Sequence, residues 1–279
     1  MPPSATSAFV ILAPQGRKQT LEYAWINAAA GCSPTLVFLH EGLGSVALWR
    51  DFPKRLCARL GWRGLVYSRR GYGASSPRPH DEPLPRHYLR REAVEVLPAL
   101  LAALGVARPW LIGHSDGGTI ALLAAALLSP HRDAASCSGI VTLAPHYYVE
   151  DVCLEGIRRA AAAFERGDLR ARLARHHQDV DGVFHGWRDV WLDPAYRDWS
   201  IEAELCRITC PALAIQGDAD EYATLEQING IKRQAPQTKL CVLPQCGHSP
   251  HLQLPEPTLD AIEAFIRAQD QNPASVKLL

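Results

Sequence analysis

The sequence has no excess of charge of either sign. Lysines and arginines together number 29 among the 279 residues, and aspartates and glutamates together also number 29. Without net charge, a protein has no long-range attraction for nucleic acid or for an anionic membrane surface. We therefore expect no nucleic-acid partner and no membrane partner.

The chain also lacks a recognisable targeting segment and paired cysteine motifs. Residues 1–14 have no basic start, and their apolar run is too short for a signal peptide or a membrane span. The eight cysteines are scattered without metal-type spacing, in a chain long enough to bury a core without disulfides. These absences predict a cytoplasmic protein with reduced, mostly buried thiols.

Strand-like and helix-like stretches alternate along most of the chain. Two apolar stretches within residues 8–27 predict an antiparallel hairpin at a sheet edge. Continuous apolar runs, typical of strands covered on both faces, lie at 35–39, 65–67, 139–143, 211–217 and 239–243, with another leading into residue 113. Helices are predicted between these runs, at 48–60 with Ser45 as the candidate cap, 88–104 with a bend at Pro98, 119–128, 224–234 and 258–268. This order predicts an α/β fold with a doubly wound, mostly parallel sheet.

Residues 146–205 interrupt this alternation. They contain no strand-like run, but they hold an alanine-rich helical stretch, many charges and clustered aromatic residues. We interpret this segment as an inserted helical cap, or lid. The core would then consist of residues 1–145 and 206–279.

One stretch combines a strand, a tight turn and a helix around Ser115. It contains Gly113-His-Ser-Asp-Gly117 and is followed by a run of strong helix formers. Such a turn holds the serine in a strained backbone conformation that exposes its hydroxyl, and the crossing of helix over strand leaves no room for a Cβ at Gly113 or Gly117. The pattern alone arises by chance in many chains, but these flanks favour a nucleophile.

A serine nucleophile needs an imidazole base, and the imidazole needs a carboxylate to orient it. On a sheet of this kind the acid should follow a late strand and the histidine the last strand. Asp218 and Asp220 follow the predicted strand at 211–217, and His248 and His251 follow the last one. The His-x-x-His pair has no suitably spaced further ligand, so we expect no metal site.

With these motifs, the sequence resembles the α/β-hydrolase superfamily over roughly residues 20–268, in its lid-bearing branch of small-molecule serine hydrolases. The resemblance implies the α/β-hydrolase fold and a cofactor-free site. It also implies a catalytic set of Ser115, His248 as the base and Asp220 as the acid, with Asp218 the rival acid and His251 an ordinary neighbour.

The resemblance further implies two donors for the oxyanion formed during acyl transfer. One is the backbone N–H of Asp116. The other comes from His40-Glu-Gly-Leu-Gly44, where the family has His-Gly-x-x-Gly, and falls on Gly42 or, if the loop is shifted, on Leu43. Glu41 replaces the usual first glycine; we expect a solvated loop carboxylate, the alternative being a place near the cleft where it influences substrate charge.

Further candidates concern the binding of substrate. Ser68-Arg-Arg-Gly-Tyr-Gly-Ala-Ser75 is similar to a family turn in which Arg70 is structural, while Arg69, if it points inward, suits a substrate carboxylate. From the cap we expect Tyr147, Trp187 and Trp191 to line the pocket. His146 is expected to be a solvated residue at the cap hinge, with the site as its alternative location.

These observations predict a serine hydrolase that cleaves an ester, thioester or lactone of a small carboxylic acid through an acyl-enzyme on Ser115. Hydrolysis of a carbon–carbon bond in a diketone-like ring-cleavage product is the alternative within the same family. An alternative of another class is a ligand-binding protein that keeps the triad but has negligible turnover. We expect a small-molecule substrate as the partner and a monomer or homodimer as the assembly.

Overall fold

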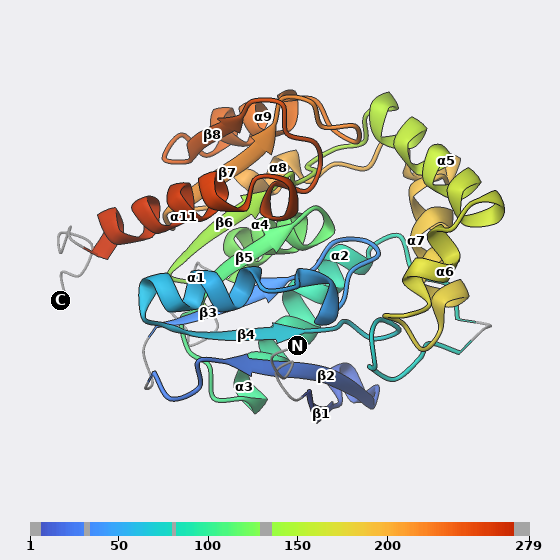
Figure 1. Cartoon of the computed structure of the whole chain (residues 1–279), viewed down its shortest axis with the longest axis horizontal. Helices are drawn as coiled ribbons and strands as arrows, with labels where there is room; N and C mark the ends of the chain where they lie inside the picture. Colours follow the sequence, from blue (N-terminus) through green and yellow to red (C-terminus); the bar gives the residue numbers. More distant parts are fainter. Residues whose placement is uncertain (1–6, 31–33, 80–81, 129–135, 271–279) are drawn as a thin grey trace.

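The computed structural model describes residues 7–30, 34–79, 82–128 and 136–270. Within them, eight strands form one mixed sheet in the order β1-β2-β4-β3-β5-β6-β7-β8 (Figure 1). The strands are β1 (Ala8–Leu12), β2 (Gln19–Ile26), β3 (Thr35–Leu39), β4 (Arg63–Tyr67), β5 (Trp110–His114), β6 (Gly139–Leu143), β7 (Ala212–Gly217) and β8 (Lys239–Leu243). The pairs β1–β2 and β2–β4 are antiparallel, and the other five pairs are parallel. The predicted edge hairpin and the doubly wound, mostly parallel sheet are confirmed.

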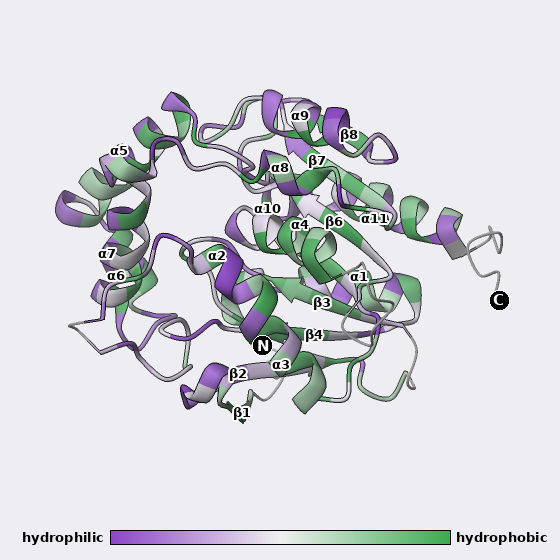
Figure 2. Cartoon of the chain, turned by 180° about the vertical axis from the view of Figure 1, so that it is seen from behind, coloured by the Kyte–Doolittle hydropathy of each residue, from purple (hydrophilic) through white to green (hydrophobic). Residues whose placement is uncertain are grey.

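Helices cover both faces of the sheet. One face carries α1 (Phe52–Leu60) and α11 (Pro255–Asp270), which lie in front of the strands in Figure 1. The view from behind shows the other face, where the mostly hydrophobic α4 (Asp116–Leu128) lies across the central strands (Figure 2). The same face carries α2 (Tyr88–Arg91), α3 (Leu97–Ala103), α8 (Glu202–Leu205) and α9 (Glu226–Gln234).

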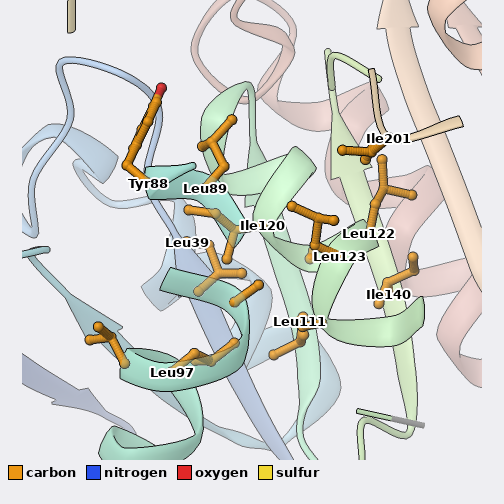
Figure 3. Close-up of a cluster of buried hydrophobic side chains, with 14 of the residues drawn as sticks. Leu39, Tyr88, Leu89, Leu97, Leu111, Ile120, Leu122, Leu123, Ile140 and Ile201 are labelled. Atoms are coloured by element: carbon orange, nitrogen blue, oxygen red, sulfur yellow. The ribbon is translucent and has the colours of Figure 1, made fainter. Parts of the chain in front are cut away.

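The central strands are buried along their whole length because both of their faces are covered. In β3, Leu36 and Phe38 belong to the hydrophobic cluster beneath α1 and α11, whereas Val37 and Leu39 belong to the cluster beneath α4. Figure 3 shows the second cluster, in which Leu39 and Leu111 of the sheet meet Ile120 of α4. This two-sided burial explains why the strands read as continuous apolar runs rather than as alternating patterns.

A helical insertion follows β6 and lies beyond one end of the sheet (Figure 1). It contains α5 (Asp151–Arg166), α6 (Leu169–Leu173) and α7 (Val180–Trp191), with a short 3-10 turn at Pro194–Tyr196. The rings of Phe164 and Phe184 stack with centroids 3.9 Å apart and join α5 to α7. Tyr148 and Ser200 form an isolated antiparallel bridge where the chain enters and leaves this insertion.

Several predicted helices differ from the observed ones. The helix expected from Ser45 to residue 60 is divided into a 3-10 turn (Ala47–Trp49) and α1, because Arg50 between them has a positive φ of 53°. The Ser45 hydroxyl finds no hydrogen-bond partner among the described residues and so does not cap a helix. In the helix expected at 88–104, the irregularity is a π-helical turn at Glu92–Val96, just before Pro98.

The C-terminal region differs from the sequence prediction in one element. A short helix, α10 (Pro250–Gln253), was not predicted from the sequence. Most of the C-terminal tail lies outside the described residues. In the described part of the chain, no helix combines the length and the apolar character that crossing a bilayer requires.

Candidate active site

Ser115 occupies a strained turn between β5 and α4. Its backbone φ is +51°, in the left-handed region that residues other than glycine rarely adopt. Its N–H donates to the Leu143 carbonyl at 2.9 Å. A Cβ at Gly113 would overlap the Gly117 carbonyl, and one at Gly117 would overlap the Leu39 carbonyl. The structure therefore has the steric requirement that the sequence predicted at both glycines.

A chain of hydrogen bonds joins Ser115, His248 and Asp220. The His248 Nε2 atom lies 3.0 Å from the Ser115 Oγ, and the His248 Nδ1 atom lies 2.9 Å and 3.0 Å from the two carboxylate oxygens of Asp220. These three residues come from the turn after β5, the loop after β8 and the loop after β7. The fold thus brings Ser115 to two residues that lie more than a hundred positions later in the sequence.

The two aspartates of the loop after β7 have different hydrogen-bond partners. Asp220 accepts hydrogen bonds from the Tyr222 N–H at 2.8 Å and from the Gln216 side chain at 3.3 Å. Asp218 instead accepts from the Gln245 N–H at 2.7 Å and holds the neighbouring loop. The geometry therefore favours Asp220 over Asp218 as the partner of His248.

The electrostatics of this pair favour an ionised carboxylate beside a basic imidazole. Burial alone raises the pKa of Asp220, but the charge of His248 and the hydrogen bonds to the carboxylate outweigh burial and bring it below its usual range. Burial alone lowers the pKa of His248, but Asp220, with smaller contributions from Glu221 and Glu41, brings it above its usual value. The imidazole is therefore prepared to accept a proton.

His251, the other histidine of the motif, faces away from this chain of hydrogen bonds. Its ring packs 4.9 Å from Trp49 and 4.7 Å from His114, measured between centroids. Burial lowers its pKa to about 3, so it is neutral near pH 7. Within the described residues, no group of three or more His, Cys, Asp and Glu side chains has an arrangement suited to a metal ion.

The residues predicted to supply oxyanion donors, Asp116 and Gly42 or Leu43, line the same cavity as Ser115. Asp116 is the first residue of α4, so its N–H has no helical partner four residues back. In the facing loop, the Leu43 N–H donates to the Glu41 carboxylate, whereas no described residue accepts from the Gly42 N–H. Gly42 rather than Leu43 is therefore free to donate to an oxyanion.

The surroundings of Glu41 and Arg69 differ from the sequence expectations. Glu41 is not a solvated loop residue: it is half-buried and lines the cavity at Ser115. Arg69 does not face that cavity, because its guanidinium donates to the carbonyls of His40 and Glu41 at 3.0 Å and pairs with Asp116 at 3.4 Å. Arg69 thus links the loop at residues 40–44 to the strained turn at Ser115, called the elbow below, and does not face a substrate.

A cavity of about 250 Å³ lies over Ser115, between the core and the cap. The predicted residues Trp187 and Trp191 line it, but Tyr147 does not, because Tyr147 packs against Gly230 of α9. His146, expected to be solvated, is buried and lines the cavity. Sequence reasoning missed the other lining residues, namely Cys153, Ile157, Glu221, Tyr222, His114 and Ser249. Four of these carried a signal, since Glu221 and Tyr222 directly follow Asp220, His114 directly precedes Ser115 and Ser249 directly follows His248.

The fold and this geometry agree with sequence relationships. Residues 34–202 match the family described as the alpha/beta hydrolase fold. The chain belongs to the α/β-hydrolase family. It is 30% identical over 261 residues to RutD of Pseudomonas syringae, provisionally assigned as a carbamate hydrolase, and the match covers 85% of this chain and 95% of RutD.

Other α/β-hydrolase comparisons are more distant. The human serine hydrolase BPHL is 26% identical, over 73% of this chain and 69% of its own. The structure of a thermophilic esterase from Thermogutta terrifontis superposes with a TM-score of 0.70 at 19% identity, covering 94% of this chain and 98% of the esterase. The chain is therefore a serine hydrolase of the α/β-hydrolase fold with esterase-type relatives at low identity.

Proposed function

We propose that this protein hydrolyses an ester, thioester or lactone of a small carboxylic acid, with Ser115 as the nucleophile. The observation that carries the proposal is the hydrogen-bonded chain from Ser115 through His248 to Asp220. A serine hydroxyl becomes a useful nucleophile when an oriented imidazole can take its proton. The cavity of about 250 Å³ above Ser115 suits a small substrate.

In the proposed reaction, the Ser115 Oγ attacks the carbonyl carbon while His248 Nε2 takes the hydroxyl proton. The N–H groups of Gly42 and Asp116 stabilise the negative charge on the carbonyl oxygen. When the intermediate collapses, His248 returns the proton to the leaving alcohol or thiol. Water then attacks the acyl-enzyme with His248 as the base, and Ser115 and the free acid are released.

Asp220 has a supporting part in this mechanism. It holds the proton of His248 on Nδ1, so that the lone pair of Nε2 faces Ser115. Its negative charge also stabilises the imidazolium that forms during each acyl transfer. The raised pKa of His248 is the ground-state sign of the same interaction.

Hydrolysis of a carbon–carbon bond in a diketone acid receives less support from the site. Such a substrate carries a carboxylate, and the residues described around the cavity include neither lysine nor arginine. The candidate cation from the sequence, Arg69, is engaged by backbone carbonyls and Asp116. The ester-type reaction needs no such partner.

Ser115→Ala tests the proposal directly. We expect a folded variant whose hydrolysis of short p-nitrophenyl esters falls by at least about 10⁴-fold, because the nucleophile is gone. A fluorophosphonate probe should label the wild-type protein on Ser115 and leave the variant unlabelled. Ser200→Ala, at the base of the cap, is the matched control and should keep both label and activity.

Two outcomes would contradict the proposal. One is hydrolysis by folded Ser115→Ala at the wild-type rate, which would exclude this nucleophile. The other is a folded wild-type protein that neither takes the probe nor cleaves any short ester or thioester, which would favour a ligand-binding protein with negligible turnover.

A further inference from the structure

The cavity over Ser115 has an acidic lining. Among the described residues that line it are three carboxylates, those of Glu41, Asp116 and Glu221, and no lysine or arginine. Burial lowers the pKa of His146 to about 3, and burial likewise brings the pKa of His114 well below its usual value. These two histidines are therefore neutral near pH 7 and do not offset the carboxylates.

One carboxylate of the lining has a cationic partner. Asp116 pairs with Arg69 and accepts a hydrogen bond from the Tyr88 hydroxyl at 2.7 Å. Asp220 lies behind His248, outside the lining, and accepts a hydrogen bond from the imidazole Nδ1–H. The charge of Asp116 is therefore balanced locally.

Glu41 differs from Asp116. Its carboxylate accepts the Leu43 N–H, but none of the described lysine, arginine or histidine side chains forms an ion pair with it. Burial, with a smaller contribution from the Asp116 carboxylate, raises the pKa of Glu41, although the Leu43 N–H and the charges of Arg69 and His248 act in the opposite direction. Glu221, the third carboxylate of the lining, lies at an exposed position. Of the two lining carboxylates without an ion-pair partner, half-buried Glu41 is thus the less exposed.

Two more features of the lining suit a cation. The Asp116 Oδ1 atom is buried and receives no hydrogen bond from any described residue. The aromatic rings of Trp187, Trp191 and Tyr222 also line the cavity. Aromatic faces attract ammonium groups, and their combination with a carboxylate is a recurring way to bind them.

We propose that this cavity selects ester and thioester substrates that carry an ammonium group. The negative charge of Glu41 attracts that group. This inference rests on the hydrolase function proposed above. A carboxylate-bearing substrate is disfavoured at the same place, because its charge has the same sign as the carboxylates of the lining. Glu41 therefore acts as a specificity residue at the position where the related loop motif has glycine.

Three thioesters of similar size test the selection by charge alone. Acetylthiocholine carries a fixed positive charge, 3,3-dimethylbutyl thioacetate is its neutral isostere, and S-acetyl-3-mercaptopropionate carries a negative charge. We expect kcat/KM to be about tenfold or more higher for the cation than for the neutral thioester, and lowest for the anion. A wild-type enzyme that prefers the anion, or that does not distinguish the three, would overturn the inference.

Glu41→Gln then assigns the effect to one residue. The glutamine carbonyl keeps an acceptor for the Leu43 N–H while the charge is removed. The ratio of kcat/KM for the cation to that for the neutral thioester should fall about tenfold, and using a ratio cancels any general loss of activity. Glu155→Gln, on the exposed side of α5, is the matched control and should leave the ratio unchanged. An unchanged ratio in Glu41→Gln would refute the role of Glu41.

A binding measurement separates this inference from the hydrolase proposal. In Ser115→Ala, calorimetry with acetylthiocholine and with S-acetyl-3-mercaptopropionate reports charge selection without turnover. Tighter binding of the cation supports the inference even if no thioester is hydrolysed by the wild-type protein. Equal binding of the two compounds, or tighter binding of the anion, contradicts it.

Discussion

At the scale of single residues, two adjacent arginines have opposite surroundings. Arg69 is buried, with a side chain that is 5% exposed, and it links Asp116 to the backbone carbonyls of His40 and Glu41. Arg70 is 21% exposed and pairs with Glu82 in a region open to solvent. Sequence reasoning gave the structural part to Arg70 and considered substrate binding for Arg69. In the structure, Arg69 joins the loop at residues 40–44 to the elbow at Ser115.

This difference predicts unequal effects on stability. Arg69→Met leaves the buried Asp116 carboxylate without its cation, and we expect the free energy of unfolding to fall by about 3–5 kcal/mol. Arg70→Met should cost less than about 1 kcal/mol, because the lost pair is partly exposed and screened by solvent. Urea unfolding of the two variants measures both values. Equal losses in the two variants would mean that the buried linkage adds nothing.

At the scale of elements, the elbow depends on close backbone contact between β3, β5 and α4. This contact leaves room for glycine alone at Gly113, where a Cβ would meet the Gly117 carbonyl. We expect Gly113→Ala to lower the free energy of unfolding by at least about 3 kcal/mol, since backbone atoms must move to admit the methyl group. The same shift should displace Ser115 and reduce esterase activity more than 100-fold.

Gly118→Ala is the matched control for this prediction. A Cβ at Gly118 would lie 3.0 Å from the Pro145 Cβ and 3.3 Å from the nearest backbone atom, against 2.1 Å from a backbone oxygen at Gly113, and alanine favours the helix in which Gly118 lies. Its stability should stay within about 1 kcal/mol of the wild-type value in the same urea titration. If both variants unfold at the same urea concentration, crowding at the elbow is not what requires glycine.

Strands were predicted more closely than helices, for a physical reason. The observed β3, β6 and β8 have the predicted bounds. In β3 and β6, two-sided burial leaves an uninterrupted apolar run in the sequence, whereas β8 is a partly exposed edge strand. The helix expected to begin near Ser45 failed because apolar spacing carries no sign of the positive φ at Arg50. Periodicity reports which side chains are buried, and it does not report a local reversal of the backbone.

At the scale of the whole molecule, the sequence located the hydrogen-bonded chain at Ser115 better than it located the cavity above it. Ser115, Asp220 and His248 follow β5, β7 and β8 in an order that the fold imposes. Ser115 and His248 could therefore be named from their places after strands, and the family resemblance selected Asp220 over Asp218. His146 and Tyr147 follow β6 side by side, yet the first lines the cavity and the second packs on α9. Their directions depend on how the cap and α9 are placed, which is a tertiary property.

Buried histidines make the stability of the whole molecule depend on pH. Burial lowers the pKa of both His146 and His251 to about 3, from an ordinary value of 6.5. A group with a lower pKa in the folded state contributes stability that is fully present above its unfolded-state pKa and is lost as pH falls toward the folded-state pKa. We expect the free energy of unfolding to decrease between pH 6.5 and pH 3, by up to about 1.4 kcal/mol per pH unit for each of the two. His248, whose pKa is raised, contributes in the opposite direction.

His251→Phe isolates one of these contributions. The ring of His251 packs against Trp49 and Phe52 with centroids 4.9 Å and 5.5 Å away, so a phenyl ring keeps the apolar contacts and removes the titration. Between pH 6.5 and pH 5, urea unfolding should show the wild-type protein losing about 1.5 kcal/mol more than the variant, because protons bind the unfolded wild-type histidine and are excluded from the folded one. Parallel losses would mean that His251 takes up its proton without unfolding, and that its burial among these rings does not exclude the charged form.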